Sequence, residues 1–282
     1  MNNGRSKLLL FAALQLWLAA GACAAELAAV VSSDYAPYSE ACSAFAGALN
    51  GPPDIYDASS PSFSVPYDLR YVATFGARAA ALRYPPETRV VYALAPVVLR
   101  GQMWYEISLL PSPDKALSAF KALQPGLKRL AVFWNVYPGE YYLEELRGAG
   151  RKLGIGIISA RLSSPDSFPK RLRHLMGRMD AFWLMPDPAL ITNTSLMVLG
   201  AFSCDNSIPF YAPTRALLER GATAAYAPDL AGAGIVAAMV VSALREGGSP
   251  SHVTYPKAEL TVNSSLRGKC RWPLSGTSPS RH

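Results

Sequence analysis

Several polar residues of this 282-residue chain come directly after apolar runs that have the length of β-strands. Ser32 and Ser33 follow one such run, and Gly76 and Ala77 follow another. A helical pattern begins at each of these places, and the free backbone amides at a helix N-terminus favour anions. We therefore expect these hydroxyl and N–H groups to bind a carboxylate or a similar anion. The alternative is that Ser32 and Ser33 only cap the first helix.

Polar residues in the second half have the same placement. Asn135 follows the apolar run Arg129–Trp134, and Asp187 lies between two prolines after a further strand-like run. An amide can hydrogen-bond a ligand, and a carboxylate can pair with a buried ammonium group, which is costly to bury alone. Both residue types also shape turns, and an aspartate can cap a helix. Asp229, at the start of a long apolar helix, has the same two interpretations.

Aromatic side chains gather near the same predicted strand ends. A flat ligand could stack on them, and each of them could equally belong to the core or to the rim of a site. The candidates are Tyr35, Tyr137, Tyr211 and Tyr226.

Catalytic and metal-binding patterns are not found in the sequence. It contains no GxSxG, P-loop or GxGxxG motif. His174 belongs to a charged helix face, His252 to a loop and His282 to the C-terminus, and the cysteines lack metal-site spacing. We therefore expect a protein that is not an enzyme and that needs no metal or other cofactor.

The segment 128–159 predicts the fold class. A strand at Arg129–Trp134, a helix between Gly139 and Gly154 and a strand at Ile155–Ile158 form a strand–helix–strand unit. Such a unit implies a parallel sheet, whose ligands bind at the carboxyl ends of the strands. Prolines interrupt the pattern of strands and helices around residues 109–117, which indicates a crossing between two α/β lobes. Further strands are predicted at Leu27–Val31, Asp54–Tyr56, Tyr71–Phe75, Arg89–Leu94, Asp180–Leu184, Ile208–Tyr211, Ala222–Tyr226 and Lys257–Asn263.

The N-terminus is typical of a secretory signal peptide, with Arg5 and Lys7 before the apolar run Leu8–Ala20. We expect residues 1–25 to be removed and the mature protein to be periplasmic or exported, with a lipid anchor on Cys23 as the alternative. The formal charge is +7, but the signal and the tail beyond Leu266 hold six of the 27 basic residues, leaving 21 against 20 acidic ones. This balance argues against nucleic-acid binding.

Three cysteines remain if Cys23 is removed or carries a lipid. Cys204 and Cys270 could form a disulfide in an oxidising compartment, and Cys42 has the position of a buried helix residue.

Most of Leu110–Ser265 resembles the substrate-binding proteins of ABC transporters, in particular the group linked to aromatic amino acids such as tryptophan. The first half resembles them more loosely, at residues 28–49, 73–82 and 90–96, and departs from them between Tyr56 and Tyr71. The matching segments of the second half are residues 110–135, 141–155, 163–188, 208–229 and 258–265.

This resemblance implies a type I periplasmic-binding-protein fold, in which two Rossmann-like lobes with parallel sheets are joined by a three-crossover hinge and close on a ligand. Lobe 1 would comprise residues 26–110 and 229–246, and lobe 2 residues 111–227 and 255–282. Asp187 would align with a family acid that faces the cleft. The partner would be an ABC permease, or a sensor kinase if the same fold serves signalling without a permease.

Overall fold

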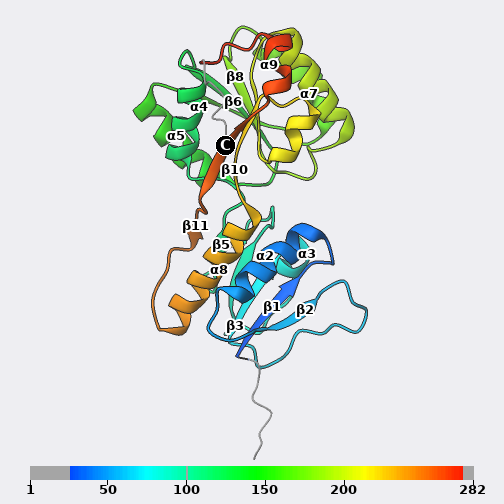
Figure 1. Ribbon diagram of the computed structural model, residues 1–282, viewed down its shortest axis with the longest axis vertical. Coiled ribbons are helices and arrows are strands. Elements are labelled where there is room, and N and C mark those ends of the chain that lie inside the picture. The colour runs from blue at the N-terminus through cyan, green and yellow to red at the C-terminus, as the bar shows by residue number, and fades with distance from the viewer. Residues whose placement is uncertain (1–25, 100, 276–282) are drawn as a thin grey trace, which may run out of the picture.

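The computed structural model describes residues 26–99 and 101–275, which form two α/β lobes (Figure 1). The predicted signal peptide, with Cys23, lies outside the described residues, as does His282. Among the helices that the structure describes, none has the length and apolar character needed to cross a membrane.

Lobe 1 is built on a six-stranded sheet in which every paired strand is parallel. All five residues of the central strand β3 are buried, and all but Thr74 are apolar or aromatic. In spatial order the strands are β2 (Asp54–Asp57), β1 (Leu27–Val31), β3 (Tyr71–Phe75), β4 (Arg89–Ala93), β5 (Trp104–Ile107) and β11 (Val253–Thr254).

Two helices, α2 (Ala36–Gly47) and α8 (Leu230–Arg245), pack together on one face of this sheet, and α3 (Ala77–Ala80) packs on the other. The contact between α2 and α8 is close enough to require glycine at one position. A Cβ atom on Gly234 would overlap the carbonyl oxygen of Ala41. The glycine therefore lets α8 lie directly on the backbone of α2 although the two helices are far apart in sequence.

Lobe 2 contains a second six-stranded sheet, parallel except for its last strand. Helices α4 (Pro113–Leu123) and α5 (Glu140–Leu153) cover one face. Helices α6 (Phe168–Leu175) and α7 (Asn193–Asp205) cover the other, together with the short 3₁₀ helices η1 (Pro165–Ser167) and η2 (Arg215–Arg220). The strands, in spatial order, are β7 (Gly156–Arg161), β6 (Arg129–Trp134), β8 (Ala181–Leu184), β9 (Phe210–Ala212), β10 (Ala224–Pro228) and the antiparallel β12 (Ala258–Val262).

The chain passes between the two sheets three times (Figure 1). The first crossing, residues 108–112, joins β5 to α4; the second, at Asp229, joins β10 to α8; the third, residues 255–257, joins β11 to β12. The two-lobed parallel fold predicted from the sequence is therefore confirmed. Two short strands, β5 and β11, and the helix α9 (Ser264–Cys270) were not predicted.

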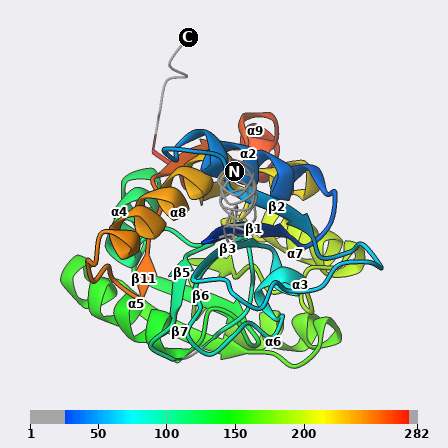
Figure 2. The same cartoon turned by 90° about the horizontal axis from the view of Figure 1, so that it is seen from below.

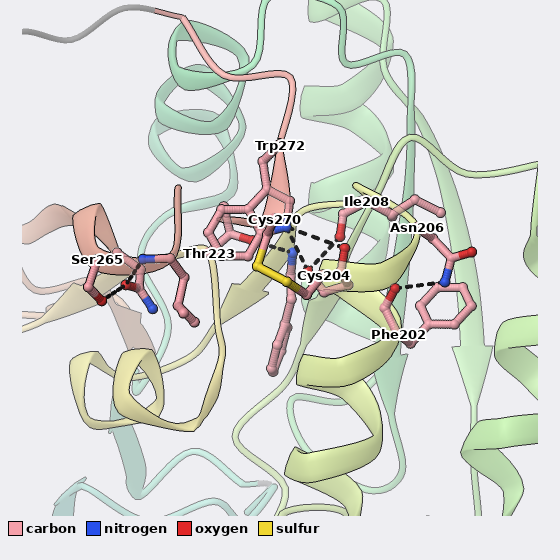
Figure 3. The surroundings of a disulfide bond; sticks show 12 residues. Phe202, Cys204, Asn206, Ile208, Thr223, Ser265, Cys270 and Trp272 are labelled. Carbon is pink, nitrogen blue, oxygen red and sulfur yellow. Dashed lines mark hydrogen bonds between the residues drawn. A yellow bond between two sulfur atoms is a disulfide. The ribbon is translucent and has the colours of Figure 1, made fainter. Parts of the chain in front are cut away.

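A disulfide between Cys204 and Cys270 joins the end of α7 to the end of α9 (Figure 3). Trp272, just beyond α9, donates a hydrogen bond from Nε1 to Oγ of Ser203 over 3.0 Å. The pairing that the sequence left open is thus present, and the C-terminal helix is held on lobe 2. Cys42 is a buried free thiol, and burial raises its pKa to about 11.

The disulfide closes a long segment, because its cysteines are 66 positions apart in the sequence. Replacing both cysteines by serine (C204S/C270S) is expected to lower the free energy of unfolding by about 2–4 kcal/mol, because the unfolded chain regains the entropy that the bond removes. Urea denaturation measures this. A reductant should destabilise the wild type and leave the double variant unchanged; equal sensitivity of the two proteins would contradict the bond's role.

Candidate ligand-binding site

A cavity of about 520 Å³ lies where the two lobes face each other, beside the first and second crossings. Its lining comes from the start of α2 and the end of β4 in lobe 1, from the start of η2 in lobe 2, and from the crossings themselves. The lining residues are Tyr35, Pro37, Tyr38, Glu40, Leu94, Leu109, Thr214, Arg215, Ala216, Ala227, Pro228, Asp229 and Leu230.

The lobe 1 wall is aromatic. Tyr35 is the N-cap residue of α2, and its ring meets that of Tyr38 edge to face, with 5.3 Å between the centroids. Burial, and then the neighbouring Tyr35, raises the pKa of Tyr38, so its phenol is a neutral hydrogen-bond donor. Tyr35 is 60% exposed, which leaves its ring free to contact a ligand.

Charged groups lie opposite and beside this wall. Arg215, at the start of η2, forms an ion pair with Glu259 over 2.9 Å between Nη2 and Oε2. Asp229 caps α8 by accepting a hydrogen bond from the Gly232 amide, so the capping role considered from the sequence is present at a residue that also lines the cavity. Glu40 lies at the exposed edge of α2.

The remaining lining is mostly apolar, with Leu94, Leu109, Ala227 and Leu230 among it. An apolar floor with a few charged groups at the edge is the usual composition of a small-molecule site, and about 300–1,000 Å³ is its usual volume. The cavity is therefore suited to a ligand with an apolar body and charged or polar ends.

The residues predicted to bind an anion in lobe 1 do not line this cavity. Oγ of the buried Ser32 accepts a hydrogen bond from the Ala79 amide over 2.9 Å, and Ser33 Oγ accepts one from the Tyr35 amide over 3.3 Å. The Gly76 amide donates to the Ala93 carbonyl over 2.9 Å. Ser32 thus accepts a hydrogen bond from an amide in the first turn of α3, which has no acceptor within the helix. The Gly76 amide is already paired with a backbone carbonyl at the end of β4.

Gly76 and Ala77 are nevertheless held next to Ser32 for a clear steric reason. Gly76 has φ +97°, and a Cβ atom there would lie 2.5 Å from Ser32 Oγ. The turn after β3 can therefore approach the turn after β1 only with glycine at this position. The structure brings these two predicted positions together, but as a structural contact, while Ala77 begins α3.

Asp187 is only 3% exposed and holds the loops of lobe 2 together. Its carboxylate accepts hydrogen bonds from the amides of Val136 at 2.8 Å, Tyr137 at 3.3 Å and Ala189 at 3.0 Å. It therefore joins the end of β8 to the end of β6. Asn135, in the same loop, is half-buried, and its backbone carbonyl accepts a hydrogen bond from Arg161.

The other predicted aromatic residues are less accessible than Tyr35. Tyr211 is 0% exposed, stacks on Phe120 at 4.0 Å and donates to Gln124 over 2.9 Å, so it is part of the lobe 2 core. Tyr226 is half-buried against the same core cluster. Neither they nor the buried Tyr137 line the cavity.

Glu106 is a buried residue that sequence reasoning missed. It lies in β5 of lobe 1, is 4% exposed, and accepts hydrogen bonds from three phenols: Tyr92 at 3.1 Å, Tyr137 at 2.9 Å and Tyr141 at 2.9 Å. Tyr92 belongs to lobe 1 and the other two to lobe 2. Tyr137 also accepts a hydrogen bond from the Leu109 amide over 3.2 Å, so this cluster fixes the first crossing. Burial raises the pKa of the Glu106 carboxyl, while the three phenol hydrogen bonds act in the opposite direction.

Comparison with known proteins agrees with this architecture. The sequence profile described as ABC transporter substrate binding protein matches residues 110–266, which run from the first crossing to the start of α9 and include α8 and β11 of lobe 1. The chain belongs to the ABC transporter substrate-binding protein family. No curated protein sequence matches the chain.

Solved structures show the same fold at low sequence identity. A substrate-binding protein with adhesive properties from Clostridium difficile, in a ligand-free open structure, is 15% identical with a TM-score of 0.62, over 90% of this chain and 96% of that one. An ABC domain from Streptococcus pneumonia in complex with L-Trp is 12% identical with a TM-score of 0.58, over 88% and 94%. A conserved domain protein from Vibrio cholerae is 16% identical with a TM-score of 0.58, over 89% and 96%.

The position of Asp187 predicts a structural effect of its removal. Asp187→Ala leaves three backbone amides without their acceptor and is expected to lower the free energy of unfolding by about 2–4 kcal/mol. Asp205→Ala, at an exposed aspartate of α7, is the control and should change it by less than about 0.5 kcal/mol. Chemical denaturation measures both. Unchanged stability of Asp187→Ala, together with weaker ligand binding, would instead assign Asp187 to the ligand.

The Glu106 cluster predicts how stability depends on pH. Because burial raises the pKa of Glu106 in the folded state, its stabilising contribution is present below the ordinary carboxyl pKa and is lost as the pH rises through the raised value. Glu106→Gln cannot ionise, so its unfolding temperature should fall less than that of the wild type as the pH is raised from acidic to mildly alkaline. Thermal unfolding across this range measures the difference. Glu87→Gln, at an exposed glutamate, should follow the wild type, and parallel curves for all three proteins would contradict the expectation.

Proposed function

We propose that this protein is the exported substrate-binding component of an ABC-type uptake system and that it captures one small ligand between its lobes. The observation that carries the proposal is the cavity of about 520 Å³, because residues of both lobes and of two crossings line it. A ligand held there contacts both lobes at once, and its binding energy therefore favours the arrangement in which they approach each other.

We further propose that the ligand is an aromatic amino acid or a similar flat, amphipathic metabolite. The Tyr35–Tyr38 pair offers a ring face and edge, and the leucine side chains offer an apolar floor. Arg215 can meet a carboxylate, and Asp229 or Glu40 can meet an ammonium group. The Streptococcus structure with L-Trp supports this choice of ligand class.

Calorimetric titration with L-tryptophan, L-phenylalanine and L-tyrosine tests the ligand class, with L-alanine and glucose as comparison compounds. We expect one-to-one binding of at least one aromatic amino acid and weaker binding of L-alanine, which lacks the ring. If none of the three aromatic amino acids binds, the proposed ligand class is wrong.

Two variants test the site itself. Ala216→Trp places a large side chain in the cavity from an exposed position and should abolish binding, whereas Ala201→Trp, on the exposed face of α7, should not. Tyr35→Ala should weaken binding about 3–10-fold through the lost ring contact. Tyr67→Ala, at a 90% exposed tyrosine outside the cavity, should leave the affinity unchanged. Equal effects of the cavity and control variants would place the ligand elsewhere.

A further inference from the structure

A second cavity, of about 380 Å³, lies at the edge of lobe 2 between the end of β7 and one face of α6. It has no lining residue in common with the interlobe cavity. In Figure 2, α6 and β7 lie in the lower part of the view, below α2 and α8, whose N-terminal residues line the interlobe cavity. We call this second cavity the basic pocket; it is lined by Arg161, Leu162, Ser163, Ser167, Lys170, Arg171 and His174.

The basic pocket gathers positive charge without a carboxylate to balance it. Among the described residues, none of Arg161, Lys170 and Arg171 forms an ion pair, and no acidic side chain lines the cavity. Residues 161–178 contain five basic residues and one acidic residue, whereas residues 26–265 as a whole contain 21 basic and 20 acidic residues. The positive charge is therefore concentrated on the segment that forms this pocket, and three of its five basic residues line the pocket itself.

One cation of the pocket, Arg161, is held in place by two contacts with neighbouring residues. Arg161 Nε donates to the Asn135 carbonyl over 2.9 Å, and its guanidinium lies 5.3 Å from the ring centroid of Trp134. These contacts fix the guanidinium while its terminal nitrogens keep donors for another acceptor. Lys170, Arg171 and His174 follow one another at helical spacing on α6, so they project from the same side of the helix.

Hydrogen-bond donors other than the cations also line the pocket. Arg178 lies 3.1 Å from Nε2 of His174, and because a guanidinium can only donate, Nε2 accepts and Nδ1 carries the ring proton. The hydroxyls of Ser163 and Ser167 add two further donors. A concave site that offers cations and neutral donors, and no acceptor carboxylate, matches the oxygen atoms of a tetrahedral oxyanion.

We propose that the basic pocket binds a phosphate-bearing small anion and is a site separate from the interlobe cavity. The planar Arg161 and Arg171 side chains can each bond two phosphate oxygens, and Lys170 adds a point charge. A volume of about 380 Å³ accommodates a phosphate group together with a small attached moiety. The phosphate can come from a free phosphorylated compound or from a phospholipid headgroup.

Calorimetry with inorganic pyrophosphate tests the free-anion source, and cosedimentation with phosphatidylglycerol vesicles, against phosphatidylcholine vesicles, tests the lipid source. We expect one-to-one binding of pyrophosphate, binding to the phosphatidylglycerol vesicles, or both. The binding should weaken as the salt concentration is raised. The pocket variant Lys170→Ala/Arg171→Gln should lose at least about tenfold in affinity, because two charge-assisted contacts are removed.

The matched control is Lys128→Ala/Arg220→Gln, which makes the same change in net charge at two exposed positions of lobe 2 outside the pocket. Equal losses in the pocket and control variants, or no binding in either arm, would overturn the proposal. The unfolding temperatures of both double variants show whether they are folded. If the pocket variant is unfolded, the single variant Lys170→Glu takes its place in the binding measurement. Binding of an aromatic amino acid should be unchanged in the pocket variant, so this proposal and the proposed uptake function can fail separately.

Discussion

The buried Glu106 carboxyl sets the arrangement of the two lobes. A carboxyl group in the interior is tolerated only where its oxygens are hydrogen-bonded, and here the three donors come from both lobes. Separating the lobes at this point would leave Glu106 with Tyr92 as its only phenol donor and would take the carboxyl acceptor away from Tyr137 and Tyr141. The network therefore resists separation of the lobes next to the first crossing, while none of its four side chains lines the interlobe cavity.

The cavity depends on this anchoring because its wall and floor come from segments that are distant in sequence. Leu109 follows Glu106 by three residues and lines the cavity, and its amide is bonded to Tyr137 of the cluster. Asp229 stands at the second crossing and caps α8. Leu109 and Asp229 thus belong both to the lining of the cavity and to the crossings between the lobes.

The sequence predicted the elements whose burial is local and missed those whose stability depends on distant partners. β3 and β6 were predicted with the observed bounds because each is an almost uninterrupted apolar run. β5 was missed because Glu106 interrupts its apolar pattern, and the tyrosines that satisfy this residue are remote in sequence. α9 was missed because a disulfide to α7 holds it in place.

For the interlobe cavity, the sequence predicted residues at the carboxyl ends of the strands, but it could not give the direction of each side chain. Of the predicted residues, Tyr35 and Asp229 line the cavity, whereas Ser32 and Asp187 are satisfied by backbone amides. A hydroxyl or carboxylate at a strand end can serve either purpose, and only the positions of neighbouring amides decide which. Arg215 gave no signal in the sequence because it reaches the site through the tertiary placement of η2.

The close contact of α8 with α2 has a consequence for how the protein is made on the ribosome. Five strands of lobe 1 and helix α2 lie before residue 108, but α8 begins only at Leu230. Until α8 has been synthesised, the face of the lobe 1 sheet that it will cover has only α2 on it and exposes apolar side chains such as Val91 and Ile107. The main strands of lobe 2 lie in between, so we expect that lobe to acquire most of its structure first, and lobe 1 to need protection during the interval.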